Sequence, residues 1–177
     1  LDLPRKISRA SMVDRLKRFP LNRTMSLEQH PQWSAVNFIQ RRLVNEGHQT
    51  LVAGGAVRDL MLSRVANDID LATSARPEQV EALFDKTVMV GRAFGVARVI
   101  HQGHDIEVAS FRKDGLYVDG RRPESIQYST PEEDAKRRDF TMNALFYDPQ
   151  KKEILDFVGG QKDIMTKVIR TVGEPVD

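Results

Sequence analysis

The feature that most constrains this sequence is a strand, glycine turn and helix pattern between Leu51 and Thr73. A short apolar run is broken by Gly54 and Gly55, and an amphipathic segment carrying Arg58 follows. Because glycine has no Cβ, the pair allows a tight turn and close approach of the backbone to a ligand. The first N–H groups of the following helix and the Arg58 guanidinium would then suit an anion such as phosphate. A plain turn is the alternative, since the pattern has neither the lysine of a P-loop nor the third glycine of a dinucleotide fingerprint.

Two carboxylates, Asp68 and Asp70, stand two positions apart at the end of the same stretch. Residues at i and i+2 of a strand share a face, so Ile69 and Leu71 are expected in the core while both carboxylates point outward. Like charges held this close repel each other, and a pair of Mg²⁺ ions about 3.5–4 Å apart would compensate them. The alternative is a solvated strand edge that follows a turn at Asn67. Together with the glycine turn, the pair indicates a site for a nucleoside triphosphate with magnesium.

Composition and charge restrict the kind of metal that the protein could bind and its expected location in the cell. The 177 residues include no cysteine and only four histidines, so a metal here should be a hard one held by carboxylates. No apolar run has the length of a membrane span and no signal peptide is visible, so we expect a cytoplasmic protein without a membrane partner. The net charge is +2, but residues 1–30 hold seven lysines and arginines against three acids. Such a basic segment suits a phosphate backbone, although a solvated tail is the alternative.

Hydrophobic periodicity divides the chain into a basic N-terminal extension, residues 1–30, and one domain, residues 31–177. Helices are expected after Pro31, at 56–62, from Pro77, from the capping box at Thr130 through Leu145, and from Gly160 to Met165. Strands are expected at 50–53, 69–72, 87–90, 96–101, 105–111 and 152–157, with a polar loop at 112–128. Because strands and helices do not alternate regularly, the pattern favours an α+β fold with a mixed sheet.

A third carboxylate, Glu107, lies in the middle of an alternating strand between Ile106 and Val108. An unpaired charge is awkward at such a place. Glu107 is therefore a candidate for a third carboxylate on the metal side. An ion pair with Arg98 or Arg112 is the alternative.

The last group of polar residues comprises Arg138, Asp139 and Asn143. Arginine can pair with phosphate oxygens, and aspartate and asparagine can bind the hydroxyls of a sugar. The alternative is a charged helix surface on which Asp134 and Arg138 pair at i, i+4.

Four motifs in this order resemble the head and early neck of the class II tRNA nucleotidyltransferases. This bacterial family contains CCA-adding enzymes and poly(A) polymerases and belongs to the polymerase-β-like nucleotidyltransferases. The resemblance runs from about Leu51 to Pro175. The motifs are Gly54-Gly55-Ala-Val-Arg58-Asp59, Asp68-Ile-Asp70-Leu-Ala-Thr73, Glu107-Val-Ala-Ser-Phe-Arg112 and Arg137-Arg138-Asp139-Phe-Thr-Met-Asn143-Ala-Leu.

The resemblance implies a head with a mixed, mostly antiparallel sheet flanked by helices, and it implies a role for each motif. Asp68 and Asp70 would be the catalytic pair that binds metal, with Glu107 as a less secure third carboxylate. The other positions would bind the nucleotide: Gly54, Gly55 and Arg58 the triphosphate, and Arg138, Asp139 and Asn143 phosphate and ribose.

The activity implied is template-independent transfer of nucleotides from CTP and ATP to an RNA 3′ end with two Mg²⁺ ions. CCA addition to tRNA is the first expectation, because Phe94-Gly95 is nearer the CCA-adding pattern. The family's flexible loop, matched here by Asp114 to Tyr128, looks whole, which favours a chain that can add adenosine. A poly(A) polymerase is the alternative, since the basic segment at 1–30 faintly resembles the lead segment of those enzymes. A non-catalytic RNA- or nucleotide-binding module is a second alternative, against which the intact Asp-x-Asp pair argues.

One expected motif is absent from this sequence. The family reads the base of CTP or ATP with a Glu-Asp-x-x-Arg motif in the neck, just after the position of Pro175. The sequence ends at Asp177. We therefore expect a truncated catalytic head that by itself binds nucleotide poorly.

Overall fold

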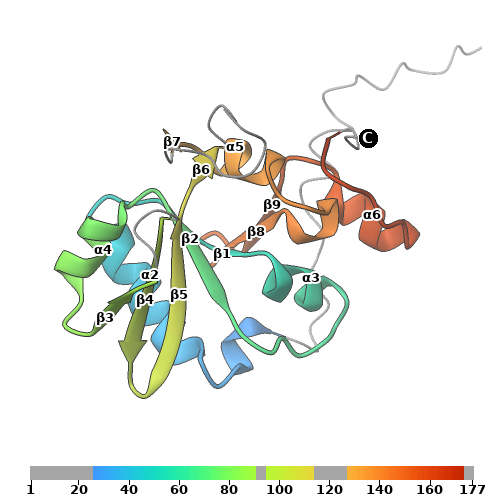
Figure 1. Ribbon diagram of the computed structural model, residues 1–177. Helices are drawn as coiled ribbons and strands as arrows, with labels where there is room; N and C mark the ends of the chain where they lie inside the picture. Colours follow the sequence, from blue (N-terminus) through green and yellow to red (C-terminus); the bar gives the residue numbers. More distant parts are fainter. Residues whose placement is uncertain (1–25, 91–94, 114–126, 174–177) are drawn as a thin grey trace, which may run out of the picture.

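The computed structural model describes residues 26–90, 95–113 and 127–173 (Figure 1). Its helices are η1 (Leu27–Gln29), α2 (Trp33–Asn45), α3 (Gly55–Met61), α4 (Pro77–Leu83), α5 (Pro131–Lys136), η3 (Thr141–Asn143) and α6 (Gly160–Thr166), where η marks a 3₁₀ turn. Its strands are β1 (Thr50–Ala53), β2 (Asp70–Thr73), β3 (Thr87–Met89), β4 (Val96–His101), β5 (His104–Ser110), β6 (Arg112–Lys113), β7 (Gln127–Tyr128), β8 (Leu145–Asp148) and β9 (Glu153–Asp156).

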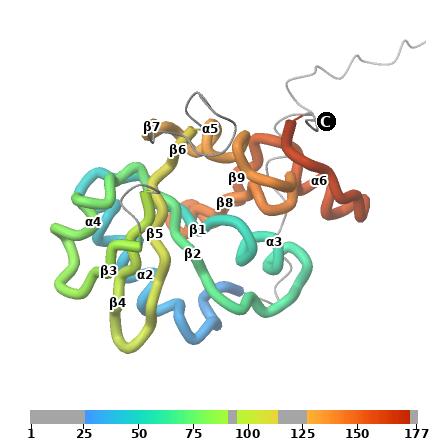
Figure 2. The backbone as a smooth tube through the Cα atoms, in the orientation of Figure 1, coloured from blue at the N-terminus to red at the C-terminus, as the bar shows by residue number. Residues whose placement is uncertain are grey.

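Seven of these strands form one sheet in the order β3-β4-β5-β2-β1-β8-β9. The pairing of β2 with β5 is parallel, and the other strand pairs of this sheet are antiparallel. Figures 1 and 2 show the long β4–β5 hairpin on one side of β2, and β1, β8 and β9 on the other. The expectation of an α+β fold with a mixed, mostly antiparallel sheet is confirmed.

The hairpin of β4 and β5 forms where alternating residues flank a two-residue turn. Gln102 and Gly103 both have positive φ, at 50° and 78°. Turns of this kind match the right-handed twist of the paired strands. The hairpin was expected from the sequence, and it places Ile106 and Val108 on one face and Glu107 on the other.

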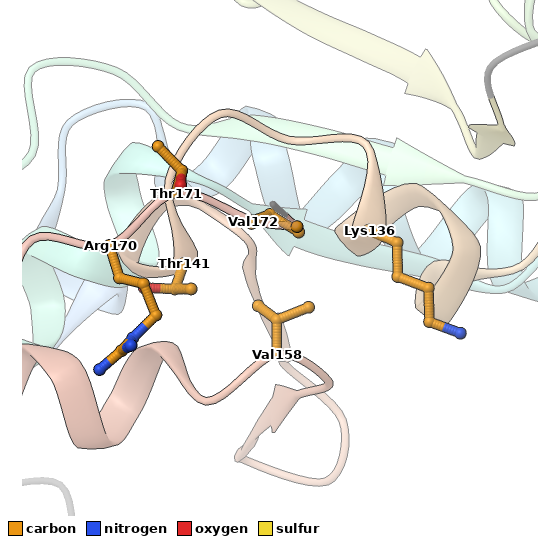
Figure 3. A pocket seen from close by; sticks show the side chains of 7 residues that line it. Lys136, Thr141, Val158, Arg170, Thr171 and Val172 are labelled. Atoms are coloured by element: carbon orange, nitrogen blue, oxygen red, sulfur yellow. The ribbon is translucent and has the colours of Figure 1, made fainter. Parts of the chain in front are cut away.

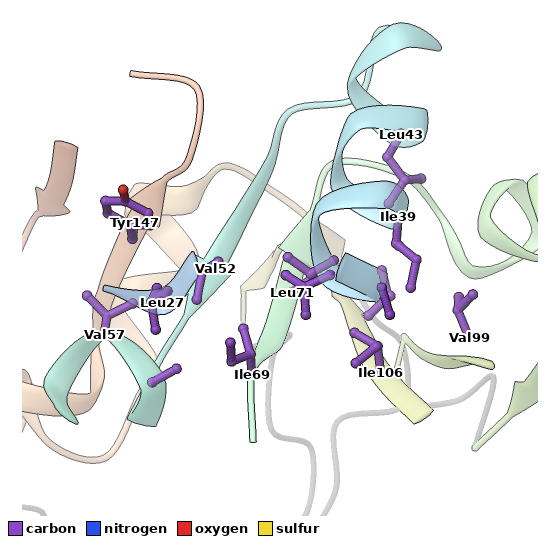
Figure 4. Packing of buried hydrophobic residues seen from close by; sticks show 14 of the residues in the cluster. Leu27, Ile39, Leu43, Val52, Val57, Ile69, Leu71, Val99, Ile106 and Tyr147 are labelled. Atoms are coloured by element: carbon purple, nitrogen blue, oxygen red, sulfur yellow. The ribbon is translucent and has the colours of Figure 1, made fainter. Parts of the chain in front are cut away.

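The two faces of the sheet bury different side chains. The larger core, shown in Figure 4, packs α2, α3 and α4 against large aliphatic residues such as Val52, Leu71 and Ile106. The opposite face carries a smaller cluster around Leu51, Phe111 and Phe146, with α5 packed on it through Ala135. Strand residues alternate between these faces, so Asp70 and Ala72 lie on the face opposite Leu71.

Several element ends differ from the expectations. The helix that starts at Pro131 stops at Lys136, and a 3₁₀ turn and strand β8 occupy the positions that were expected to extend it. Tertiary contacts hold this region extended: Phe140 forms a bridge with Thr171, and the Thr141 hydroxyl donates to Asp163 at 2.8 Å. The ends of the expected polar loop at 112–128 form the β6–β7 ribbon.

The described part of the expected N-terminal extension begins at Ser26. Leu27 is part of the larger core, so the described end of the expected extension packs against the domain. Four expectations lie wholly or partly outside the described residues: those on 1–25, Phe94, 114–126 and 174–177. Within the part of the chain that the structure describes, no helix has both the length and the apolar character needed to cross a membrane.

Candidate functional site

Most of the expected site residues line one hollow on the sheet face opposite α2. The hollow has a volume of about 360 Å³, and its floor includes three small side chains from neighbouring strands, Ala53, Ala72 and Ala109. The larger Val52 and Leu71, which alternate with them, point into the other core. Because an alanine side chain is short, this face of the sheet has room for a ligand.

Two acidic residues, Asp70 and Glu107, line the hollow and are here called the acidic wall. Leu71 of β2 pairs with Val108 of β5 in parallel register, so Asp70 and Glu107 stand side by side at the preceding position. Burial, Glu107 and then Asp68 raise the pKa of Asp70 from 3.8 to about 6, while Arg138 lowers it. Glu107 and Asp68 are therefore close enough to disfavour the charged form of Asp70.

The backbone between Asp68 and Asp70 is held by a residue that sequence reasoning did not single out. The N–H of Ile69 donates to Gln32 Oε1 at 3.1 Å, at the N-terminal end of α2. Ile69 itself is buried, which confirms that the two aspartates flank a core residue. Asp68 is exposed and lies beside the lining of the hollow rather than within it.

Of the two arginines considered as partners of Glu107, Arg98 forms an ion pair with Asp105. Arg98 is opposite Glu107 in the β4–β5 register. Its guanidinium, however, bonds to Asp105, with Nε–Oδ1 at 2.9 Å and Nη2–Oδ2 at 2.7 Å. Arg112, the other partner considered, lines the same hollow as Glu107.

Three basic residues of the same lining, Arg58, Arg137 and Arg138, are here called the basic wall. Arg58 donates through Nε to Asp59 at 3.0 Å and through Nη1 to Asn143 Oδ1 at 2.7 Å. Asn143 in turn donates through Nδ2 to Asp139 at 3.3 Å. The Asn143 amide thus joins an arginine on the phosphate side of the expected site to the aspartate expected to bind ribose.

Arg137 and Arg138 share one buried partner, Asp134, whose side chain is only 2% exposed. Arg138 also lies over the Phe146 ring at 4.9 Å and donates to the Asn143 carbonyl oxygen at 3.3 Å. The Asp134–Arg138 pair considered as an alternative therefore exists. It does not lie on an exposed helix surface, since the arginine lines the hollow.

Gly54 is required at its position for two separate reasons. Its backbone has φ 68° and ψ −125°, a conformation that other residues rarely adopt. A Cβ at Gly54 would also lie 3.2 Å from Arg138 Nη1. Gly55 has neither constraint, since a Cβ there would meet Arg58 Nη2 at an ordinary 3.6 Å.

The structure thus brings together Gly54, Gly55, Arg58, Asp70, Glu107, Arg138 and Asn143 in the lining of one hollow. Asp139 is exposed beside it and is held by Asn143. Two lining residues, Arg112 and Arg137, were not among the nucleotide-binding or catalytic residues expected from the sequence. Their signal was present, because each lies within one of the four motifs.

A larger hollow of about 760 Å³ lies between α5, η3 and the C-terminal segment (Figure 3). Lys136 and Arg170 are its charged lining residues, and Val158 and Val172 are apolar. Among the described residues of this lining there is no carboxylate pair, so its size alone does not make it the better site for a metal and a nucleotide.

Comparison with known proteins gives a consistent result. The family described as "Poly A polymerase head domain" matches residues 50–170, more than half of the chain. The CCA-adding enzyme of Bacillus subtilis is 49% identical over 140 residues, which cover 78% of this chain and 35% of that protein.

Two solved structures extend the comparison to the fold. The Bacillus stearothermophilus CCA-adding enzyme in complex with CTP aligns with a TM-score of 0.73 and 41% identity, over 82% of this chain and 35% of that one. A CCA-adding enzyme in complex with ATP aligns with a TM-score of 0.61 and 26% identity, over 79% and 34%. The chain therefore spans about a third of the length of the relatives it matches.

The family match covers all four motifs and both walls of the hollow, and the fold agrees with it. The chain belongs to the poly A polymerase head domain family, as the resemblance to class II tRNA nucleotidyltransferases implied.

Proposed function

We propose that this chain is the catalytic head of an RNA nucleotidyltransferase that adds cytidine and adenosine, from CTP and ATP, to the 3′ end of tRNA. The observation that carries the proposal is the gathering of two carboxylates and four arginines in the lining of one hollow. Relatives named CCA-adding enzymes, with solved complexes of CTP and of ATP, support the choice of substrates.

The carboxylates fit divalent metal of the Mg²⁺ type. Hard cations prefer oxygen ligands, and Mg²⁺ is usually held by one or two carboxylates together with substrate phosphates. Within the described ranges no group of three or more Asp, Glu, His or Cys side chains could hold a metal ion by itself. Two carboxylates completed by phosphate oxygens match the Mg²⁺ arrangement, and the pKa of Asp70 is raised by its burial and then by the neighbouring carboxylates Glu107 and Asp68, which a cation would offset.

We assign the metal to Asp68 and Asp70, with Glu107 as the adjacent third carboxylate. When bound, the metal would lower the pKa of the RNA 3′-hydroxyl and neutralise charge on the leaving pyrophosphate. Asp70, itself with a raised pKa, must be ionised for this role.

The basic wall binds and orients the triphosphate. Arg58 and Arg138 pair with its oxygens and hold the α-phosphorus in line with the incoming 3′-oxygen. The new bond joins that oxygen to the α-phosphorus, the bond to the bridging oxygen breaks, and the hydroxyl proton leaves to solvent. Asp139, held by Asn143, binds the ribose hydroxyls of the nucleotide.

The test uses the native protein that contains this chain and a tRNA transcript lacking its CCA end. Each nucleoside triphosphate is supplied separately, and chain extension is measured on a sequencing gel. Incorporation of cytidine before adenosine is expected, and it should disappear in Asp70→Ala. Asp105→Asn is the matched control, because Asp105 is an exposed acid on the same sheet face that pairs with Arg98.

Other outcomes point to other functions. Long adenosine tails on any RNA would show a poly(A) polymerase. RNA binding that is indifferent to magnesium and to a non-hydrolysable triphosphate, without extension, would show a non-catalytic module. Near-normal extension by Asp70→Ala would overturn the metal assignment.

A further inference from the structure

The basic wall is held from behind by one carboxylate that does not itself line the hollow. Asp134 lies in α5 and is nearly completely buried, with a side chain 2% exposed. Its Oδ1 accepts a hydrogen bond from Arg137 Nε at 2.8 Å and lies 2.8 Å from Arg137 Nη2 in an ion pair. Its Oδ2 accepts from Arg138 Nε at 3.2 Å and Nη2 at 3.0 Å. Each arginine therefore presents the same edge of its guanidinium to Asp134.

The geometry of the guanidinium decides where the rest of each arginine points. The group is planar, with five N–H donors in a fixed fork. When the Nε–Nη2 edge is used on Asp134, the Nη1 end faces away from it. For Arg138 this end reaches the Asn143 carbonyl oxygen and lies beside Gly54, at the hollow. One carboxylate thus fixes both side chains while their outer donors stay directed toward a ligand.

Asp134 also connects the two arginines to a second segment of the chain. Its Oδ1 accepts a hydrogen bond from the backbone N–H of Arg112 at 3.2 Å, where strand β6 begins. Burial of a carboxylate is costly unless it is paired and hydrogen-bonded, so these contacts hold one another in place. Because two guanidinium groups share one carboxylate, the cluster of Asp134, Arg137 and Arg138 keeps a net positive charge. This charge favours binding of an anionic ligand.

We propose that Asp134 is a positioning residue that orients Arg137 and Arg138 for the phosphate oxygens of the incoming nucleotide. The proposal rests on the proposed function of the hollow. Free arginine side chains have many rotamers, and ordering them on binding costs affinity. Fixing the two side chains in advance removes that cost. The affinity gained in this way should concern the triphosphate and not the base or the sugar.

The test measures binding of CTP and of cytidine, which has no phosphates, to the native protein that contains this chain. Asp134→Asn keeps the size of the side chain but removes its charge. The dissociation constant for CTP should rise about tenfold, while that for cytidine should change less than about twofold. Glu132→Gln is the matched control, because Glu132 lies on the same helix and its partner Lys136 is exposed.

A double-mutant cycle separates positioning from a merely structural role. In a background of Arg137→Ala with Arg138→Ala, Asp134→Asn should raise the CTP dissociation constant by less than about twofold more. Equal losses for CTP and cytidine, or a full tenfold effect in that background, would overturn the proposal. Thermal melting of each variant verifies that the folded protein is being compared.

A second variant covers the case in which Asp134→Asn does not fold. Asp134→Glu keeps the charge but moves the carboxylate outward, so KM for CTP should rise severalfold, less than for the asparagine variant. A wild-type KM would contradict the positioning role. If the unmodified protein neither binds CTP nor extends tRNA, the proposed function has failed; if it does both and Asp134→Asn binds CTP normally, only this inference has failed.

Discussion

The two walls of the hollow are stabilised in opposite ways. Each arginine of the basic wall is held by hydrogen bonds that it donates to other side chains, namely Asp59, Asn143 and Asp134. In the acidic wall, by contrast, Asp70 is held in place by its strand, and its charge is opposed by burial and by Glu107. The arginine side chains are thus fixed by hydrogen bonds within the fold, whereas bringing the carboxylates together costs free energy of folding.

This difference shows what each wall needs from outside the chain. Fixed donors can bind a phosphate without reorganisation, which is how a site stabilises charge at low cost. Crowded carboxylates lower the stability of the folded protein until a cation joins them. The nucleoside triphosphate and divalent metal of the proposed function would supply both partners at once.

The largest expected effect comes from removing the charge of the acidic wall. Asp70→Asn should lower nucleotide incorporation on the order of 10³-fold, because a metal contributes several kcal/mol to the stabilisation of transition-state charge. Incorporation kinetics with saturating CTP measure this change. If the variant retained more than a tenth of the activity, the acidic wall would not depend on a cation in the way that distinguishes it here from the basic wall.

The same substitution, Asp70→Asn, should lower activity but raise the stability of the metal-free protein near pH 7. Because the pKa of Asp70 is raised from 3.8 to about 6 in the folded protein, the folded state binds this proton more tightly than the unfolded state does. Stability from this group therefore falls as the pH rises from about 4 to about 6, and it stays low above that range. Without metal, Asp70→Asn should melt above the wild type near pH 7 and together with it near pH 3.5. Thermal melts across this pH range provide the measurement.

Gly54→Ala should disturb the basic wall without touching a charge. The positive φ costs roughly 1–3 kcal/mol of stability for a residue with a Cβ, and the new methyl group lies against Arg138 Nη1. We expect a lower melting temperature and roughly tenfold weaker CTP binding. Gly55→Ala is the control, because its Cβ would have ordinary contacts. Equal effects of the two substitutions would contradict the role given to Gly54.

Asn143→Asp should separate the two contacts of the bridging amide. The carboxylate can still accept from Arg58, but it can no longer donate to Asp139 and repels it instead. KM for CTP should therefore rise about threefold to tenfold, with a greater loss for the ribonucleotide than for the 2′-deoxy analogue. An unchanged preference for ribose would show that the link to Asp139 has no role in sugar recognition.

The smallest effect is expected at Gln32, which holds the backbone beside the acidic wall. Gln32→Ala removes its hydrogen bond to the Ile69 N–H and should cost about 1 kcal/mol of stability, with a twofold to threefold loss of incorporation. Ser34→Ala is the control, since its hydroxyl bonds to Gln102 at an exposed position. Chemical denaturation and incorporation rates would separate the two variants.

Sequence patterns gave the strands beside the site well, because alternation and turn residues are local signals. Strand β1 has the expected bounds, Thr50–Ala53, and the β4–β5 hairpin turns at Gln102 and Gly103 as expected. The helix from Pro131 was too long in the expectation. Its continuation looked amphipathic, but bonds to distant residues, such as Thr141 to Asp163, overrode the local preference.

The site was predicted as a set of residues but not as an arrangement. Arg58, Asp70 and Arg138 follow from motifs, since the chemistry of each is visible in its side chain. The adjacency of Asp70 and Glu107 depends on the parallel register of β2 and β5, which no local pattern encodes. Gln32 had no signal at all, because one hydrogen bond to a backbone N–H leaves no periodicity behind.

The parallel pairing of β2 with β5 also has a consequence for the order of folding. Helix α4 and strands β3 and β4 lie between the two paired strands in the sequence, so the whole segment must be in place before Asp70 and Glu107 meet. Closing such a loop lowers the entropy of the chain before the β2–β5 contacts can stabilise it. The turn from Gly54 to Arg58 needs no such closure. The nascent domain should therefore acquire its glycine turn early and the strand edge proposed to bind metal late, and pulsed hydrogen exchange should protect the β4–β5 hairpin before the β2–β5 pair.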